Sequence, residues 1–411
     1  MSIITRRNAL KLSLGALSAG VTTAAYASTG PASSRQGTAK ACILLYMVGG
    51  ASQIDTWDPK PGRPTGGEFS SIRTTLPGVH VSEHLPGLAR RANDLAIVRS
   101  LSYREGNHAR ARYLMHTGFV PAGGTRHPGL GSFLHAAQAP GAPLPGNITV
   151  GGPGHKAGLL GPTHDPFVVN NPTRTVRNVQ SDMSAARLDA RLEMWSALQG
   201  DFAAERSPNA VLGHDAVVDQ AVRMMRAQEL EAFDLGQEPR TVSERYGPGK
   251  FGQGCLMARR LVERGVPFVE VQMGGWDTHQ SNFERVAALS AELDTAMSAL
   301  LDDLKSSGVL DETLVLWMGD FGRTPRINAR GGRDHYPHVA SAVLAGGGVT
   351  GGQVIGATDA DGIAVTQRPV SVADLHRTVH TKLGLDPEDV RLSSGGRPIS
   401  AVDGGTVIDG L

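Results

Sequence analysis

Carboxylates and imidazoles gather in one stretch of the chain, directly behind the apolar run Leu314–Met318. Asp320 follows this run at once, and Asp334, His335 and His338 come soon after it. A short apolar run with a β-branched residue, bounded by glycine, predicts a buried central strand. The carboxyl end of such a strand is where open α/β sheets bind ligands. Each of these residues alone could cap a turn, but together they predict a divalent-metal site.

Three other apolar runs, each predicted to be a strand, also lead into candidate ligands. These runs are residues 41–48, 95–98 and 268–272. The first precedes Asp55 and Asp58, between which the sequence does not decide. The second precedes His108, and the third precedes Asp277 and His279. The predicted metal ligands are Asp55, Asp277, His279, Asp320, Asp334, His335 and His338.

This ligand set predicts one or two divalent ions. Carboxylates are hard oxygen ligands, whereas imidazoles suit zinc or manganese, so the candidates are zinc, manganese, calcium and magnesium. Two ions about 4 Å apart would clamp a phosphate- or sulfate-like group and activate the attacking oxygen. Arg112 and Arg323 are predicted to neutralise the anion through bidentate hydrogen bonds.

His108 stands at the start of a predicted helix, behind Asn107, which is a good N-cap residue. The helix dipole at this position disfavours a protonated imidazole. A neutral His108 could bind metal or attack an electrophile, or it could merely cap the helix, and the sequence leaves these alternatives open. His116, two turns further along, is predicted to be structural.

The elements that must position these residues alternate between strand and helix. Helices are expected at residues 85–92, 107–118, 254–264, 283–305 and 372–383, with a mainly helical stretch at 182–232 and a loop-rich one at 119–175. A further strand is expected at residues 339–344. Such alternation predicts an α/β fold with a mostly parallel central sheet and helices on both faces.

The first 27 residues have the features of a targeting signal. Arg6 and Arg7 form a twin-arginine pair, a mild apolar stretch follows, and Ala25–Ala27 is a small-x-small cleavage site. We therefore expect cleavage near Ala27, engagement of the twin-arginine export machinery, and a periplasmic or secreted protein. Residues 28–40 read as a linker and residues 41–411 as a single domain.

Composition excludes two classes of partner. Removal of the signal leaves 37 basic and 39 acidic residues, a net charge of about −2, so no basic excess points to nucleic acid. No other segment approaches the roughly 20 uninterrupted apolar residues of a membrane span. The 411 residues, 40% of them hydrophobic, are otherwise typical of a globular protein.

Four motifs together resemble a known family. They are Gly49–Pro61, Gly275–His279, Gly319–Pro325 and Gly332–His335. In this order they are similar to the twin-arginine-exported branch of the alkaline phosphatase/sulfatase superfamily that is described as domain of unknown function 1501. The resemblance covers nearly the whole mature chain. It implies a three-layer sandwich and metal-dependent chemistry on phosphate or sulfate esters.

The chain departs from the wider superfamily at three places. Phe321 stands where a second histidine ligand is usual, and Gly49-Gly50 replace the aspartates that normally end the first strand. His108 stands at the position of the nucleophile, which sulfatases make from a modified Cys or Ser. The resemblance implies a hydrolase of an anionic small-molecule or carbohydrate ester, with His108 as nucleophile or ligand. The alternative is a non-catalytic exported binding or assembly protein that retains the fold.

Overall fold

A computed structural model describes residues 38–176, 179, 181, 183–205, 208–393 and 395–411. The predicted signal peptide, residues 1–27, and most of the predicted linker lie outside the described residues, so both stay predictions. None of the described helices combines the length and the apolar character needed to cross a bilayer.

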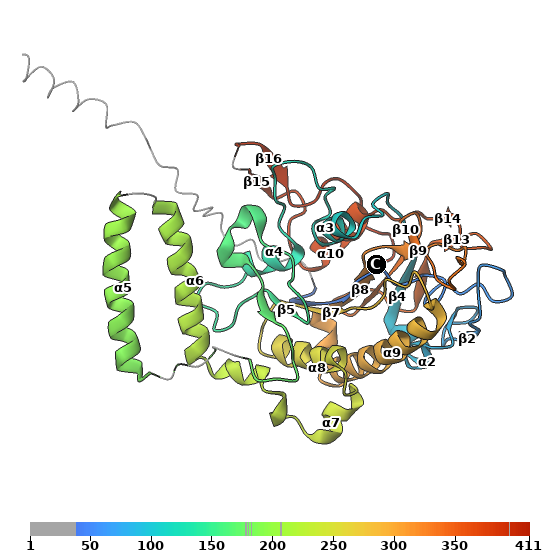
Figure 1. Ribbon diagram of the computed structural model, residues 1–411, viewed down its shortest axis with the longest axis horizontal. Helices are drawn as coiled ribbons and strands as arrows, with labels where there is room; N and C mark the ends of the chain where they lie inside the picture. The colour runs from blue at the N-terminus through green and yellow to red at the C-terminus, as the bar shows by residue number, and fades with distance from the viewer. Residues whose placement is uncertain (1–37, 177–178, 180, 182, 206–207, 394) are drawn as a thin grey trace, which may run out of the picture. The chain divides into compact units, whose positions relative to one another are not determined.

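An eight-stranded sheet forms the centre of the fold, in the order β12-β4-β11-β8-β1-β7-β5-β6 (Figure 1). The strands are β1 (Ala41–Met47), β4 (Leu95–Leu101), β5 (Ile148–Val150), β6 (Phe167–Val169), β7 (Phe268–Met273), β8 (Thr313–Gly319), β11 (Ala340–Ala345) and β12 (Gln353–Ile355). Neighbouring strands are parallel except at β11, which runs antiparallel to both β4 and β8. The predicted mostly parallel sheet is confirmed.

Helices cover both faces of this sheet because its central strands are apolar on both sides. In β1, Ile43 and Leu45 belong to one buried cluster and Leu44 and Tyr46 to the other. The first cluster includes residues of α2 (Pro86–Arg90), α8 (Lys250–Glu263) and α9 (Asn282–Ser306). The second includes residues of α3 (His108–Thr117), α4 (Leu130–Ala136) and α10 (Val372–Lys382). The result is the predicted three-layer α/β sandwich.

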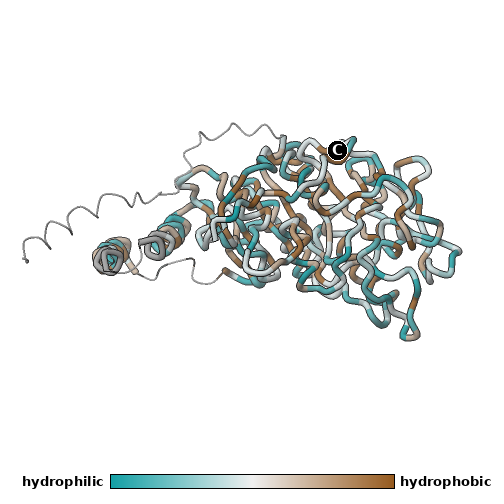
Figure 2. Tube along the Cα trace, turned by 90° about the horizontal axis from the view of Figure 1, so that it is seen from above, coloured by the Kyte–Doolittle hydropathy of each residue, from teal (hydrophilic) through white to brown (hydrophobic). Residues whose placement is uncertain are grey.

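Three strands differ from the sequence expectation, whereas the predicted helical stretch is confirmed. β5, β6 and β12 are each three residues long, and two of them lie in the stretch predicted to be loop-rich. The stretch predicted to be mainly helical forms two helices, α5 (Ala185–Glu205) and α6 (Pro208–Arg226), which lie side by side (Figures 1 and 2). A strand of three residues carries too short a pattern to be distinguished from a loop.

Short elements surround the sheet. They are β2 (Ser71–Arg73), β3 (His80–Ser82), α7 (Arg240–Arg245), β9 (Gly322–Arg323), β10 (His335–Tyr336), β13 (Ala357–Thr358), β14 (Val365–Gln367), β15 (Val390–Leu392) and β16 (Pro398–Ser400). The pair β9 and β10 bears on the candidate site, because it pairs His335 with Arg323 just beyond the end of β8.

Candidate metal centre

The polar side chains singled out in the sequence converge at the carboxyl edge of the sheet. β1, β4, β7 and β8 all run toward this edge. The chain segments that follow β4, β7 and β8 therefore bring His108, Asp277 and Asp320 to the same place. His335 joins them from the β9–β10 hairpin.

Asp277 lies at the centre of three imidazoles. Its carboxylate is 3.4 Å from Nε2 of His108, 3.1 Å from Nε2 of His279 and 3.3 Å from Nε2 of His335. The Nε2 atoms of His279 and His335 are themselves only 2.9 Å apart. Asp277 is 44% exposed, so the cluster is open to solvent on one side.

The opposite nitrogen of each imidazole is tied to an oxygen. The acceptors are Oδ2 of Asp320 for His108 (2.8 Å), Oδ1 of Asp334 for His279 (2.7 Å) and the main-chain oxygen of Gly106 for His335 (2.7 Å). Since these oxygens can only accept, each Nδ1 carries the hydrogen, and in the neutral ring each Nε2 carries a lone pair.

Three lone pairs and one carboxylate thus face one another. Ligand atoms of His108, Asp277 and His335 all lie within 4.8 Å of one another, with His279 beside the last two. Nε2 of His108 is buried without a hydrogen-bond partner among the described residues. An imidazole whose Nδ1 is held by a carboxylate or carbonyl is the arrangement that protein metal sites use. The donor set therefore fits a divalent cation.

The charge of Asp277 is secured by its neighbours. Burial opposes its ionisation, but the hydrogen bond and charge of Arg323 outweigh burial, and His108 and His279 add to their effect. Together these groups hold the pKa of Asp277 at about 2. Arg323 Nη2 lies 2.5 Å from Oδ1 of Asp277. Asp277 is thus an anion at any ordinary pH, as a metal ligand must be.

Asp320 supports the centre from behind and does not face the open side. It is fully buried, and it accepts hydrogen bonds from Tyr46 (2.7 Å), the Gly49 amide (3.0 Å) and His108. Burial opposes its ionisation, but the bonds from His108 and Tyr46 outweigh this and lower the pKa of Asp320. Asp320 therefore orients His108, and its role as a direct ligand stays a prediction.

The predicted ligand role of Asp55 is contradicted by its contacts. Both of its oxygens accept from the guanidinium of Arg333, at 2.7 and 2.9 Å, and Asn282 donates to Oδ2 at 2.8 Å. All three side chains are buried. Asp58, the other choice, accepts from Lys60 and Thr358. Both carboxylates are thus engaged by these donors, and each stabilises its own loop.

The two predicted anion-binding arginines also differ. Arg323 is fully buried and donates to the main-chain oxygens of Gly49, Gly50 and Arg333 as well as to Asp277, so the prediction that it clamps an anion is wrong. It positions Asp277 instead. Arg112 is about one-third exposed, with Nε 3.7 Å from Oδ1 of Asp320. Its role as an anion clamp stays a prediction.

Two residues of the predicted set lie at the margin. His338 is exposed, and its ring packs on Tyr336, so it lies outside the group around Asp277. Asp334 is exposed and reaches the centre only through His279, whose hydrogen bond lowers the pKa of Asp334. It supports His279 through this hydrogen bond, and its role as a ligand stays a prediction. The ligand roles of His108, Asp277, His279 and His335 stay predictions.

The departures from the superfamily pattern have a packing reason. A side chain at Gly49, where φ is +109°, would place its Cβ 2.5 Å from the Asp277 amide nitrogen. The glycine therefore lets the β1 and β7 loops approach each other. Phe321 is buried, and its ring contacts the rings of His108 (4.8 Å between centroids) and His335 (4.4 Å). It forms an apolar wall behind the centre.

Sequence reasoning missed three supporting groups. The Tyr46 hydroxyl holds Asp320, the Tyr103 hydroxyl donates to its main-chain oxygen at 2.6 Å, and the Gly106 carbonyl holds His335. Tyr46 lies inside an apolar strand, where a tyrosine reads as core. Residue types do not show which main-chain carbonyl will accept a hydrogen bond from a side chain. No signal of residue type or spacing marks these groups.

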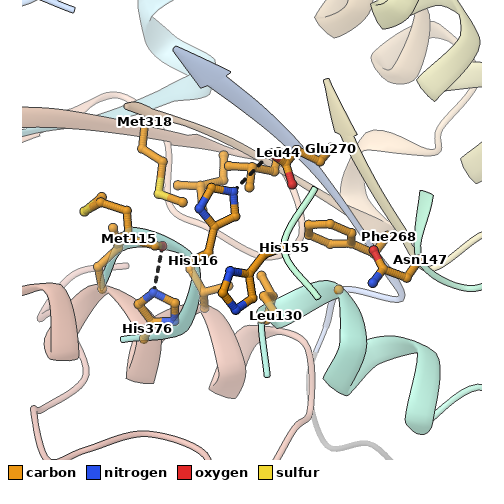
Figure 3. A pocket seen from close by; sticks show the side chains of 15 residues that line it. Leu44, Met115, His116, Leu130, Asn147, His155, Phe268, Glu270, Met318 and His376 are labelled. Carbon is orange, nitrogen blue, oxygen red and sulfur yellow. Dashed lines mark hydrogen bonds and ion pairs between the residues drawn. The ribbon is translucent and has the colours of Figure 1, made fainter. Parts of the chain in front are cut away.

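A second group, of three histidines and one carboxylate, lines a pocket under α3 (Figure 3). Nε2 of His116 lies 3.0 Å from Oε1 of Glu270, and its Nδ1 lies 2.8 Å from the main-chain oxygen of Arg112. His155 and His376 line the same pocket. These contacts agree with the structural role predicted for His116, which stays a prediction.

Solved structures with a similar course of the chain include three bacterial proteins. The lipoteichoic acid synthase LtaP from Listeria monocytogenes shares 10% identity at a TM-score of 0.41, over 86% of this chain and 74% of that one. The PsFucS1 sulfatase from Pseudoalteromonas sp. shares 12% identity at a TM-score of 0.40, over 84% of this chain and 68% of that one. The alkaline phosphatase of the Antarctic bacterium TAB5 shares 12% identity at a TM-score of 0.36, over 77% of this chain and 94% of that one.

These values are too low to carry an argument about activity. No curated protein sequence matches the chain. The model of one protein family matches residues 39–411, which is nearly the whole described chain. The chain belongs to this family, which is described as protein of unknown function DUF1501.

Proposed function

We propose that this chain is an exported metal-dependent hydrolase of a phosphate or sulfate ester. The observation that carries the proposal is the set of three imidazole Nε2 atoms that lie within 3.4 Å of the Asp277 carboxylate, while the Nδ1 atom of each ring donates to another oxygen. Lone pairs that face one another at 2.9 Å repel unless a cation or a proton lies between them.

His108, Asp277, His279 and His335 would hold the ion. A bound divalent ion there supplies a Lewis acid for the ester oxygen and lowers the pKa of bound water. Imidazole-rich sites favour zinc or manganese over calcium or magnesium, which prefer oxygen ligands. Since Asp55 and Asp320 are occupied elsewhere, the described residues support one ion better than two.

The chain's own groups would do the remaining work. Arg112, one-third exposed beside Asp320, would bind the anionic group of the ester and balance its charge. Asp320 would hold His108 in the tautomer that presents Nε2 to the centre. We assign His108 as a ligand, because one lone pair cannot both coordinate an ion and attack an ester. The twin-arginine signal fits export of a protein folded with its ion already bound.

Metal content tests this proposal. We would purify the wild-type protein without chelator after export through its own signal, together with Asp277→Asn and the control Asp311→Asn at an exposed carboxylate. We expect about one divalent ion per wild-type chain, retained in the control. In Asp277→Asn we expect affinity for added zinc to fall at least about 100-fold. A folded wild-type chain that neither contains an ion nor binds added zinc contradicts the proposal.

Hydrolysis separates the enzyme from the alternative. The metal-loaded wild-type protein should cleave aryl phosphates or aryl sulfates, and Asp277→Asn should not. Arg112→Ala should keep the ion but lose turnover, because its guanidinium meets the ester and not the metal. If the ion is bound but neither ester class is cleaved, the non-catalytic binding protein becomes the better account, because one supported metal site is also compatible with that role.

A further inference from the structure

The loop between β9 and β10, residues 324–334, lies against residues 278–282, which follow β7. Three main-chain hydrogen bonds join them: the amide of Arg333 donates to Thr278 (3.0 Å), that of Ser281 to Arg330 (3.3 Å) and that of Asn282 to Gly331 (2.9 Å). A Cβ at Gly332 would lie 2.1 Å from the carbonyl carbon and oxygen of His279, so only glycine allows this approach. This contact brings His279 next to His335, which lies 56 positions further along the chain.

One side chain, that of Asn328, bonds to both segments. Its Oδ1 accepts from the amides of Arg330 (2.9 Å) and Gly332 (3.0 Å), which turns the tip of the loop. Its Nδ2 donates to the main-chain oxygen of His279 (3.1 Å) and to Oδ1 of Asp334 (3.3 Å). Main-chain amides can only donate, so they fix which end of the Asn328 amide is oxygen. Both hydrogens of this amide and both acceptor positions of its oxygen are therefore in use.

The bond from Asn328 supplies what Asp334 lacks by itself. The Asp334 side chain is 54% exposed, and its Oδ1 accepts from Nδ1 of His279 at 2.7 Å. Water competes for an exposed carboxylate, so one such bond holds the imidazole weakly. Asn328 donates to the same oxygen, and it also holds the main chain of His279. The carboxylate and the ring that it orients are thus fixed by one amide group.

We propose that Asn328 is a positioning residue of the metal centre, which keeps the hydrogen of His279 on Nδ1 and its Nε2 directed at Asp277 and His335. Its hydrogen bonds go to its own loop, to His279 and to Asp334, so it acts on the centre through His279. The importance of this role for metal binding rests on the proposed function. The orientation of the ring does not, because it can be measured in protein without metal.

Asn328→Asp tests the role on the full-length folded protein. The variant keeps the shape and both acceptor bonds, loses both donated bonds, and sets a second carboxylate against Asp334. We expect its affinity for zinc to fall at least about tenfold. Asn171→Asp is the matched control, because Asn171 also accepts from an amide two positions on, that of Thr173 at 3.1 Å, and its Nδ2 donates to no group in the described part of the chain. The control should stay within about twofold of wild type.

A double-mutant cycle separates positioning of His279 from a general loosening of the loop. His279→Ala removes the ligand on which Asn328 acts. In that background, Asn328→Asp should lower zinc affinity less than about threefold further, because residues that act through one another are not additive. A further loss of about tenfold or more would show that Asn328 supports the loop and not His279 in particular. Denaturant unfolding of each variant verifies that the protein is folded.

The second measurement needs no metal. In chelator-treated protein with ¹⁵N-labelled histidine, the ring nitrogen shifts report which nitrogen carries the hydrogen, and His279→Ala identifies the signals. At about pH 8.5, where an ordinary histidine is neutral, His279 should hold its hydrogen on Nδ1 in wild type and lose this preference in Asn328→Asp. An unchanged ring in Asn328→Asp would overturn the assignment. A wild-type protein that binds no zinc would contradict the hydrolase proposal, and the nitrogen shifts would still decide the role of Asn328.

Discussion

The edge cluster around Asp277 and the pocket under α3 use the same residue types and the same two elements. β7 carries Glu270 and leads to Asp277, and α3 carries His108 at its start and His116 near its end. In the pocket, both nitrogens of His116 face oxygen acceptors, so both donate. At the edge, each imidazole donates with one nitrogen only and turns the other toward its neighbours.

This difference separates a structural pair from a candidate site. Burial alone would lower the pKa of His116, but the charge and hydrogen bond of Glu270 outweigh it and raise that pKa, while His116 in turn lowers the pKa of Glu270. The pair is therefore an internal salt bridge in which both nitrogens of His116 have an acceptor. The cavity beside it is about 20 Å³, room for one water molecule and not for an ester.

The largest expected effect comes from breaking the structural pair. Glu270→Ala leaves a buried, charged His116 without its partner, so we expect the free energy of unfolding to fall by about 3–5 kcal/mol. Zinc affinity of the folded fraction should change less than about twofold, because Asp320 and not Glu270 orients His108. Denaturant unfolding and zinc titration measure the two quantities.

A conservative variant sharpens this prediction. Glu270→Gln keeps an acceptor for His116 and removes only the charge, so its loss of stability should be clearly smaller than that of Glu270→Ala. Loss of the ion in a folded Glu270→Ala protein would show that the pocket belongs to the metal centre. The distinction drawn between the two clusters would then fail.

The main features of the fold could be predicted because its central strands carry strong local signals. The runs at 41–48 and 314–318 are uniformly apolar and fall within β1 and β8 to within a residue or two. The helix at 283–305 has a regular apolar period and matches α9. β5 and β6 could not be predicted, because each is three residues long and depends on its neighbours in the sheet for its hydrogen bonds.

The location of the site could be predicted from the sequence, but the role of each residue in it could not. Strand ends brought Asp277, His279 and His335 together as expected. The sequence could not distinguish Asp55, which Arg333 binds from 278 positions further along the chain, from a free carboxylate. Nor could it tell that Arg323 is buried. The roles of Asp55 and Arg323 depend on which residues, distant in sequence, contact them in the folded chain. The spacing of residues along the sequence does not contain that information.

The next largest effect concerns the orientation of His108. Asp320→Asn keeps the shape of the side chain but can turn an NH₂ group toward Nδ1, which then accepts instead of donating. Nε2 would carry the hydrogen and lose its lone pair, so zinc affinity should fall about 10–100-fold. Tyr103→Phe is the control, since the Tyr103 hydroxyl donates to the main-chain oxygen of residue 320 and not to its carboxylate. Equal affinity in Asp320→Asn and wild type would exclude the orienting role.

The last prediction concerns the pH dependence of stability that arises from His376, a buried histidine in the pocket under α3. His376 lines the pocket under α3, and its Nε2 donates to the main-chain oxygen of Met115 at 3.0 Å. Burial, with a smaller contribution from the nearby His380, lowers the pKa of His376 to about 3. When the pH is below 6.5, the ordinary pKa of histidine, the unfolded chain binds a proton at His376 that the folded chain does not bind. The free energy of unfolding therefore decreases as the pH is lowered.

His376→Gln should remove this contribution. Between about pH 6 and pH 4, the free energy of unfolding of the variant should fall less steeply than that of wild type, by about 1.4 kcal/mol per pH unit. Above about pH 7.5 the two curves should run parallel, because His376 is then neutral in both states. Chelator-treated protein is used for both, so that release of an ion from the edge cluster does not contribute. Equal slopes at acidic pH would mean that the pocket tolerates a charged His376, and that the buried cluster is less closed to protons than its packing indicates.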